Sequence, residues 1–220
     1  MVSVDIFRQF YTYLANKSNV GNTMTTPQYN INCFQAMMIP YAKDYETFVS
    51  TGVVSQYLQG FLKGGTESYV FNSLSVNQII PYPSDFQYVS SVGTYYNQTQ
   101  NDATLVDNVA WREMFRPNSL NAPTTRFPKY QQIGSGIVIA PANITGYMDY
   151  FYTPPQPVWN YTIVNNRQVF NPTGSVNLDI DAWATNMVMA HFLQFVGINL
   201  QDNAIAGFAQ AFTAETNLPL

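Results

Sequence analysis

The sequence predicts an α+β fold, in which helices from both ends of the chain form an antiparallel helical bundle that carries an inserted antiparallel β module. Apolar residues recur with helical spacing at residues 3–61 and again at 179–215. Between them, Val, Ile, Tyr, Phe and Thr are enriched with partial alternation, which is typical of strands. More than half of the prolines fall between Trp111 and Trp159, where the turn signals are densest. We therefore expect three parts: bundle helices at 1–66, a β module with Pro-rich loops at 67–178, and completing helices at 179–220.

The composition favours a protein whose surface is covered by neighbours. A chain of 220 residues fits one large domain, or a domain with an insertion. Its charged fraction is 10%, far below the usual quarter of a globular chain, whereas Tyr (16) and Phe (15) are abundant. Interface cores are depleted in charge and enriched in aromatic residues. We therefore expect a subunit of an assembly rather than an isolated protein.

The charge pattern argues against tight binding of nucleic acid. The net charge is −4, and only the stretch from Arg112 to Lys129 is mildly basic. Cys33 and His191 are the only residues of their types, which excludes an intramolecular disulfide and multi-Cys or multi-His metal sites. Asp5 and Arg8 interrupt the start of the chain, where a signal peptide needs an apolar run. No window reaches the 18 apolar residues of a membrane span, so we expect synthesis in a cytoplasm and no membrane partner.

Three helices are expected before residue 66. The first covers residues 3–16, with Ser3 as a cap, and its apolar stripe comprises Ile6, Phe10, Tyr13 and Leu14, widened by Phe7 and Tyr11. The second starts with Thr26 as N-cap and Pro27 at the first position, and runs to about residue 50. Pro40 within it predicts a kink or a break. A short third helix is expected at 54–61.

The centre of the chain is expected to hold most strands. Strand-like segments cover 68–80, 86–96 and 103–106, and Asp107 can cap a short helix that ends before Pro117. Segments 126–133, 136–140 and 145–153 predict a meander, with turns at Gly134–Gly136 and Pro141–Asn143. Asn165–Asn166 predicts the turn of a small hairpin between 161–164 and 168–170.

Two helices are expected near the end. The first begins at Asp179 or Asp181 and ends at Gly197. One of its faces is expected to hold Ile180, Trp183, Met187, Val188, His191, Phe195 and Val196. The last is expected at about 201–215, burying Ile205, Phe208 and Phe212.

A series of motifs carries a family resemblance. In order these are Arg112 in a helix; Ser119-Leu-Asn-Ala-Pro-Thr124; Phe127-Pro128; a strand ending at Pro141; Tyr150 to Pro154; Pro157-Val-Trp-Asn-Tyr161; an Asn-containing hairpin; Ser175-Val-Asn-Leu178; and Gly197-Ile-Asn-Leu200. The ordered set resembles a family of virion proteins from crAss-like phages, the short-tailed phages of gut Bacteroidetes, and covers roughly residues 105–215. The chain departs from the pattern at Phe208-Ala209, where Tyr-Ala is usual, and in its apolar rather than charged end. These departures leave open which ring of the neck or tail it forms.

The resemblance implies a ring-forming head-to-tail adaptor, part of the connector between the capsid portal and the tail. It implies a homo-oligomeric ring of twelve copies, with the portal and other neck or tail ring proteins as partners. Genomic DNA would pass through the channel without specific binding, including during DNA ejection. The protein would reside in the virion after assembly in the cytoplasm of the bacterial host.

No residue stands out as catalytic, cofactor-binding or metal-binding, so we expect no enzyme and no cofactor. His191 on an apolar face and Cys33 among apolar residues favour core or interface positions. Asp179 and Asp181 are better explained as helix-start residues than as a glycosidase pair. The turn Gly134–Gly136 lacks the Lys and the helix of a phosphate loop.

Two functions remain open, a phage ring subunit and a module that binds a glycan or receptor. The second would use an aromatic platform of Phe127, Tyr130, Tyr147, Tyr150, Tyr152, Trp159 and Tyr161, although alternating aromatics on strands are more often sheet core or interface. Trp, Tyr and Arg dominate binding hot spots. For the ring we therefore expect as interface anchors Trp111, Arg112, Arg126, Trp159, Tyr161 and Arg167.

Overall fold

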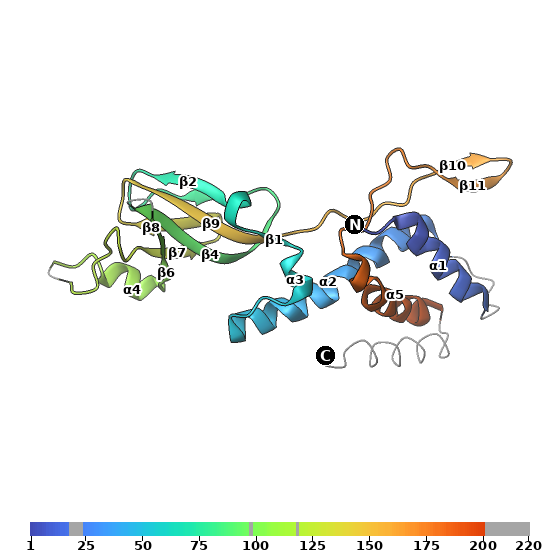
Figure 1. Cartoon of the computed structure of the whole chain (residues 1–220), viewed down its shortest axis with the longest axis horizontal. Coiled ribbons are helices and arrows are strands. Elements are labelled where there is room, and N and C mark those ends of the chain that lie inside the picture. Colours follow the sequence, from blue (N-terminus) through green and yellow to red (C-terminus); the bar gives the residue numbers. More distant parts are fainter. Residues whose placement is uncertain (18–23, 97–98, 118, 201–220) are drawn as a thin grey trace. The chain divides into compact units, whose positions relative to one another are not determined.

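The computed structural model describes residues 1–17, 24–96, 99–117 and 119–200 (Figure 1). The chain divides into two compact units. Unit 1 comprises Met1–Gly60 together with Pro154–Leu220, and unit 2 comprises Phe61–Thr153.

The protein is a mixed α/β chain, and the predicted helical bundle with an inserted antiparallel β module is wrong. Its described residues form five α-helices and eleven strands, arranged in sheets of five, four and two strands. The expected third helix is the single turn α3 (Gln56–Gln59), too short to pack as a bundle helix. Strands also occur in unit 1, and one strand pair of unit 2 is parallel. The helix expected at 201–215 lies outside the described residues.

The described part of unit 1 holds three long helices besides the single turn α3: α1 (Val4–Lys17), α2 (Thr26–Thr51) and α5 (Thr185–Leu200). The N-cap of α2 is Thr25, one residue before the predicted one, and its N–H donates to Oε1 of Gln28 over 3.2 Å. Helix α2 continues through Pro40, so no break occurs there; burial of the flanking Met37 and Tyr41 offsets the lost backbone hydrogen bond. Helix α5 also continues past Gly197, its predicted end, and is preceded by the 3₁₀ turn η2 (Ala182–Ala184).

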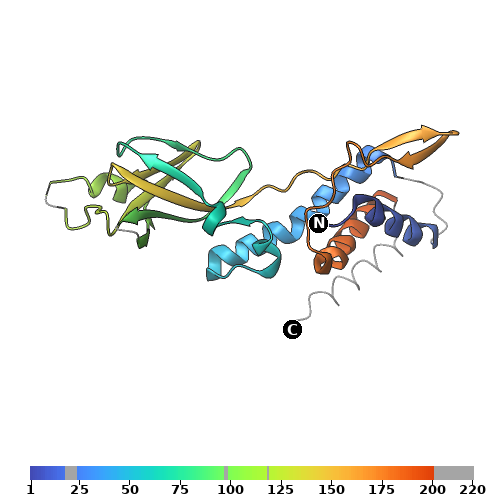
Figure 2. The same cartoon turned by 45° about the horizontal axis from the view of Figure 1, so that its top comes forward.

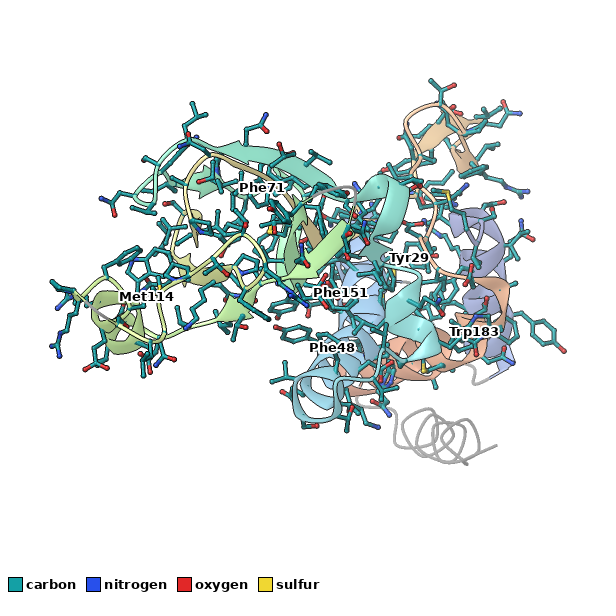
Figure 3. The ribbon with its side chains drawn as sticks, turned by 60° about the vertical axis from the view of Figure 1, so that its left-hand side comes forward. Tyr29, Phe48, Phe71, Met114, Phe151 and Trp183 are labelled. Atoms are coloured by element: carbon teal, nitrogen blue, oxygen red, sulfur yellow. The ribbon has the colours of Figure 1, made fainter. Side chains whose placement is uncertain are left out.

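Phe192 of α5 lies at the centre of the core of unit 1. Its ring centroid lies 5.5 Å from Phe7, 5.2 Å from Tyr11 and 5.5 Å from Tyr29, each in an edge-on arrangement. Tyr29 also donates its hydroxyl hydrogen to the carbonyl of Val4 over 3.0 Å, which joins α1 to α2. Figure 3 shows Tyr29 among these helices.

Helix α1 is apolar on two faces. The face that packs in the core is the one with Phe7 and Tyr11, which the sequence predicted only as a widening of the apolar stripe. Val4, Phe7 and Tyr11 are at most 7% exposed. The predicted stripe instead faces outward, with Ile6 65%, Phe10 40% and Tyr13 59% exposed. Periodicity cannot choose between two apolar faces of one helix.

A β-hairpin completes unit 1. Strands β10 (Tyr161–Val164) and β11 (Arg167–Phe170) pair in antiparallel register, which confirms the predicted hairpin. Asn165 and Asn166 adopt φ angles of 50° and 61°, as a two-residue hairpin turn requires. In Figures 1 and 2 the hairpin extends away from the helices of unit 1. At its base, Val2 bridges Leu178 and Val158 bridges Val176.

Unit 2 consists of two sheets and the short helix α4 (Asn108–Glu113). The five-stranded sheet holds β1 (Leu62–Lys63), β9 (Ile144–Tyr152), β4 (Phe86–Tyr96), β5 (Thr99–Asp102) and β2 (Tyr69–Ser73). The four-stranded sheet holds β3 (Ile80–Pro81), β8 (Gly136–Ala140), β7 (Lys129–Ile133) and β6 (Thr104–Leu105). The predicted meander is wrong, because β7 pairs with β8 but β9 crosses to the other sheet.

The core of unit 2 lies between its two sheets. One apolar cluster combines residues from both sheets: Phe71, Ile80, Val89, Val92, Tyr130, Ile137, Ile139, Ile144 and Met148. Strand β8 is buried along its whole length, because its alternate residues Val138 and Ala140 pack against Trp111 and Met114 at α4. Figure 3 marks Phe71 and Met114 in these separate parts of unit 2. The predicted cap Asp107 is confirmed, since Oδ1 accepts from the N–H groups of residues 109 and 110 over 2.9 and 2.7 Å.

Candidate interaction surfaces

Arg8 joins segments of unit 1 that lie far apart in sequence. Its guanidinium carbon lies 3.5 Å from the ring centroid of Trp159 and 5.3 Å from that of Tyr29. The indole N–H of Trp159 donates to Oδ1 of Asp5 over 2.9 Å, and its backbone N–H donates to Oδ1 of Asn30 over 2.9 Å. We call Arg8, Asp5, Tyr29 and Trp159 the arginine clamp.

Two open cavities lie beside the clamp. One of about 470 Å³ is lined by Arg8, the start of α2, Tyr161 and Gln168. The other, of about 480 Å³, is lined by Arg8, Trp159, Gln168 and the outer side of α1. Nη1 and Nη2 of Arg8 make long hydrogen bonds, each 3.4 Å, to Thr26 and Gln168. Burial lowers the pKa of Arg8, but a guanidinium stays charged at neutral pH.

The hairpin presents apolar side chains away from the clamp. Tyr161 stacks on Trp159 and Phe170 packs against it at a tilt, with centroids 5.5 and 6.1 Å from its ring. Ile163, Val164 and Val169 are 69%, 49% and 46% exposed, and we call these three the hairpin surface. Exposed apolar side chains that lie together are typical of interaction surfaces, so the hairpin surface is a candidate for one.

A second exposed surface lies in unit 2, between α4 and β7. Leu120 is fully exposed, Phe127 66% and Phe115 44%. The surrounding charges are one acidic side chain, Glu113, and four basic ones: Arg112, Arg116, Arg126 and Lys129. We call the described residues from Arg112 to Lys129 the basic loop. A cavity of about 360 Å³ at its base is lined by Ala110, Glu113, Met114, Arg116, Pro117, Ser119, Asn121 and Lys129.

The six predicted anchors divide between the two units. Trp159, Tyr161 and Arg167 belong to the clamp and the hairpin, whereas Trp111, Arg112 and Arg126 lie in or beside the basic loop. Trp111 is 9% exposed and Trp159 5%, so most of each ring packs inside its own unit. Arg112, Arg126 and Arg167 are exposed, and Tyr161 is partly exposed. Their role as interface anchors stays a prediction.

Arg8, Leu120 and Trp183 are surface or linking residues that the sequence patterns did not predict. A signal for Arg8 existed, because it stands as the one charge within the aromatic part of the first helix. Leu120 and Trp183 carry no such signal, since their exposure depends on the tertiary fold.

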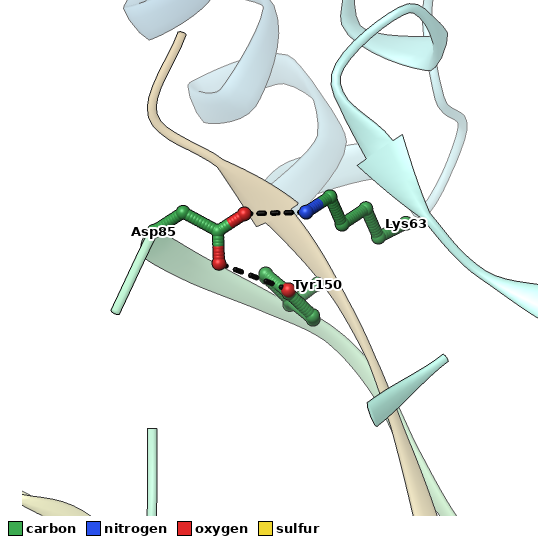
Figure 4. Close-up of polar contacts among 3 residues, drawn as sticks. All are labelled: Lys63, Asp85 and Tyr150. Carbon is green, nitrogen blue, oxygen red and sulfur yellow. Dashed lines mark hydrogen bonds and ion pairs between the residues drawn. The ribbon is translucent and has the colours of Figure 1, made fainter. Parts of the chain in front are cut away.

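A polar cluster in unit 2 ties three segments together (Figure 4). Lys63 lies 2.5 Å from Oδ2 of Asp85, and the hydroxyl of Tyr150 donates to Oδ1 over 3.0 Å. Burial acts to raise the pKa of Asp85, but the hydrogen bonds from Lys63 and Tyr150 outweigh it and the pKa is lowered. The hydrogen bond to Asp85 raises the pKa of Lys63. Both charges are satisfied within the cluster, so it fits a structural tie between β1, β4 and β9.

The other candidates from the sequence take structural positions. Cys33 is fully buried, and burial raises the pKa of its thiol to about 12, which keeps it protonated. His191 is partly exposed, its Nδ1 is buried without a hydrogen-bond partner, and burial lowers its pKa. Gly134 and Ser135 form the turn between β7 and β8. Of the proposed aromatic platform, Tyr130, Tyr147, Tyr150 and Trp159 are at most 7% exposed, since they belong to the cores.

Within the described part of the chain, no group of three His, Cys, Asp or Glu side chains is placed to hold a metal ion. None of the helices described there has the length and apolar character that crossing a membrane requires.

No protein-family model matches the chain, and no curated protein sequence matches it significantly.

Proposed function

We propose that the protein is a structural virion subunit of a tailed phage, one ring of the connector that joins the capsid portal to the tail and surrounds the DNA channel. The observation that carries this proposal is the presence of three separate exposed apolar surfaces. These are the outer stripe of α1 (Ile6, Phe10 and Tyr13), the hairpin surface and the basic loop. A subunit of a ring contacts neighbours on opposite sides, and several distinct apolar surfaces suit that role.

Two further observations support the same function. The ordered motifs between Arg112 and Leu200 resemble those of phage neck and tail proteins. The net charge of −4 lets DNA pass a channel wall without adhering to it, because like charges repel.

The test is the assembly state of the purified full chain, measured by native mass spectrometry and negative-stain electron microscopy. We expect closed rings with one copy number. One variant probes each surface: Phe10→Asp, Ile163→Asp and Leu120→Asp. Leu74→Asp is the matched control, since Leu74 is 71% exposed but belongs to none of the three surfaces.

The three surface variants should lose the ring mass, whereas the control should keep it. A wild-type chain that stays monomeric or trimeric and binds polysaccharide would overturn the ring and favour a glycan-binding module.

A further inference from the structure

We propose that the basic loop of one copy docks on an acidic turn of a second copy, formed by Asp179, Asp181 and Trp183. This inference rests on the proposed function, for which it names the contact between neighbouring subunits.

The basic loop combines exposed apolar side chains with arginines that have weak partners or none in the described structure, whereas Lys129 donates to the carbonyl oxygen of Asn121 over 2.8 Å. Among the described residues it forms one ion pair, which joins Arg116 to Glu113 over 3.8 Å between side chains that are 72% and 56% exposed. Such a pair contributes little to stability and leaves both groups available. Arg112 and Arg126 form no ion pair with any described residue. A partner with negative charge and an apolar anchor would satisfy this loop.

The charge distribution identifies the partner as another copy. Residues 108–133 hold four basic side chains and one acidic one, a charge of +3, while the whole chain carries −4, so the remainder carries −7. That remainder would be repelled by the two common anionic partners, nucleic acid and an acidic membrane. It would attract the basic loop of a second copy, since opposite potentials steer association.

The acidic turn offers the matching chemistry in unit 1. Asp181 is exposed and Asp179 partly exposed, and they flank the buried Ile180 just before α5. Trp183 is 47% exposed, although its ring meets Tyr57 edge-on at 6.3 Å. A large exposed Trp beside carboxylates is typical of a binding hot spot rather than of a core residue.

The cavity at the base of the basic loop provides a place for this Trp. Met114 and Pro117 line it with apolar surface, and the two positive charges of Arg116 and Lys129 exceed the one negative charge of Glu113. An indole seated there gains apolar contact and cation–π attraction together. Because the two patches differ, their contact is heterologous, and repeated copies join head to tail.

The experiment is a charge exchange between the two patches of the full chain. Arg126→Glu and Asp181→Lys are made separately and together, and Lys43→Glu is the control with the same charge change as Arg126→Glu on an exposed part of α2. Self-association is measured by sedimentation velocity in about 50 mM and about 500 mM NaCl. Thermal unfolding verifies that each variant is folded.

We expect wild-type association to weaken with salt, and each single variant to weaken it at least about tenfold. The double variant should recover association, and so should a mixture of the two single variants, which shows that the contact joins different copies. Trp183→Ala should weaken association at either salt concentration. The Lys43→Glu control should behave as wild type.

Several results would overturn the inference: a wild type that is monomeric at roughly 1 mM, a charge exchange without recovery, or a control as weak as Arg126→Glu. If rings form equally well in wild type and in all charge variants, this docking is wrong but the proposed function stands. If filaments or open oligomers form instead of rings, and their association is lost in the single variants and recovered in the double variant, the docking stands and the ring is wrong.

Discussion

The arginine clamp can be tested by removing either half of the stacked pair between Arg8 and Trp159. Arg8→Met retains most of the apolar stem but removes the charge above the indole. The guanidinium lies 3.5 Å from the ring centroid and is partly buried, so its cation–π contribution is about 2 kcal/mol. Its two 3.4 Å hydrogen bonds to neutral oxygens add less than about 1 kcal/mol together. We therefore expect Arg8→Met to lower the free energy of unfolding by about 2 kcal/mol.

A double-mutant cycle isolates the stacking itself. Trp159→Leu should cost about 3 kcal/mol, because a 5% exposed ring and its hydrogen bond to Asp5 are lost. The double variant should cost about 1.5 kcal/mol less than the sum of the single variants, since the stacking can be lost only once. Urea unfolding followed by circular dichroism at 222 nm reports unit 1, which holds the long described helices. A coupling energy below about 0.5 kcal/mol would refute the clamp, and Lys43→Met controls for the lost positive charge.

Three further predictions concern stability. Gly136→Ala should destabilise unit 2 by about 2 kcal/mol, because a Cβ there falls 2.0 Å from the carbonyl oxygen of Ile80. Gly134→Ala meets nothing within 4 Å and should be near neutral. Both variants are compared in tryptophan fluorescence melts of a Trp159→Phe, Trp183→Phe background, in which Trp111 is the remaining tryptophan. Burial lowers the pKa of His191, so the unfolded chain takes up the proton first as pH falls below 6.5; the urea midpoint should drop from pH 7.5 to 5.5, and His191→Leu should remove that drop. Asp85→Asn should lower the free energy of unfolding by less than about 1 kcal/mol, since the side chains of Lys63 and Asp85 are 32% and 34% exposed. Because the pKa of Asp85 is lowered in the folded chain, this contribution is present above pH 3.8 and is lost as the pH falls through the folded-state pKa. The difference in melting temperature between wild type and Asp85→Asn should therefore be smaller at pH 2 than at pH 6.

Local chemistry explains which elements the sequence could predict. The hairpin turn at Asn165–Asn166 and the cap at Asp107 depend on neighbouring residues alone, and both are confirmed. The pairing of β9 with β4 joins Phe86 to Tyr152, which are far apart in sequence. Neither strand carries a local sequence signal that identifies the strand with which it pairs. A meander of adjacent strands is the simplest expectation from the turns, and it fails for that reason.

The candidate surfaces could be predicted only in part. The basic stretch from Arg112 to Lys129 is visible in the sequence, because charge does not depend on packing. The burial of Trp111 and Trp159 is not visible, since an aromatic residue suits a core as well as an interface. The outer face of α1 had the same ambiguity, as both of its faces are apolar.

The separation of unit 1 into two chain segments has a consequence for synthesis. Helices α1 and α2 leave the ribosome before unit 2, but their core partner Phe192 is translated only after all of unit 2. Unit 2 is continuous in sequence and can complete its own core while the chain is still growing. During translation the chain therefore holds a folded β-rich unit and two apolar helices that still lack their core partner. Chaperones would be most needed between the synthesis of unit 2 and that of Phe192.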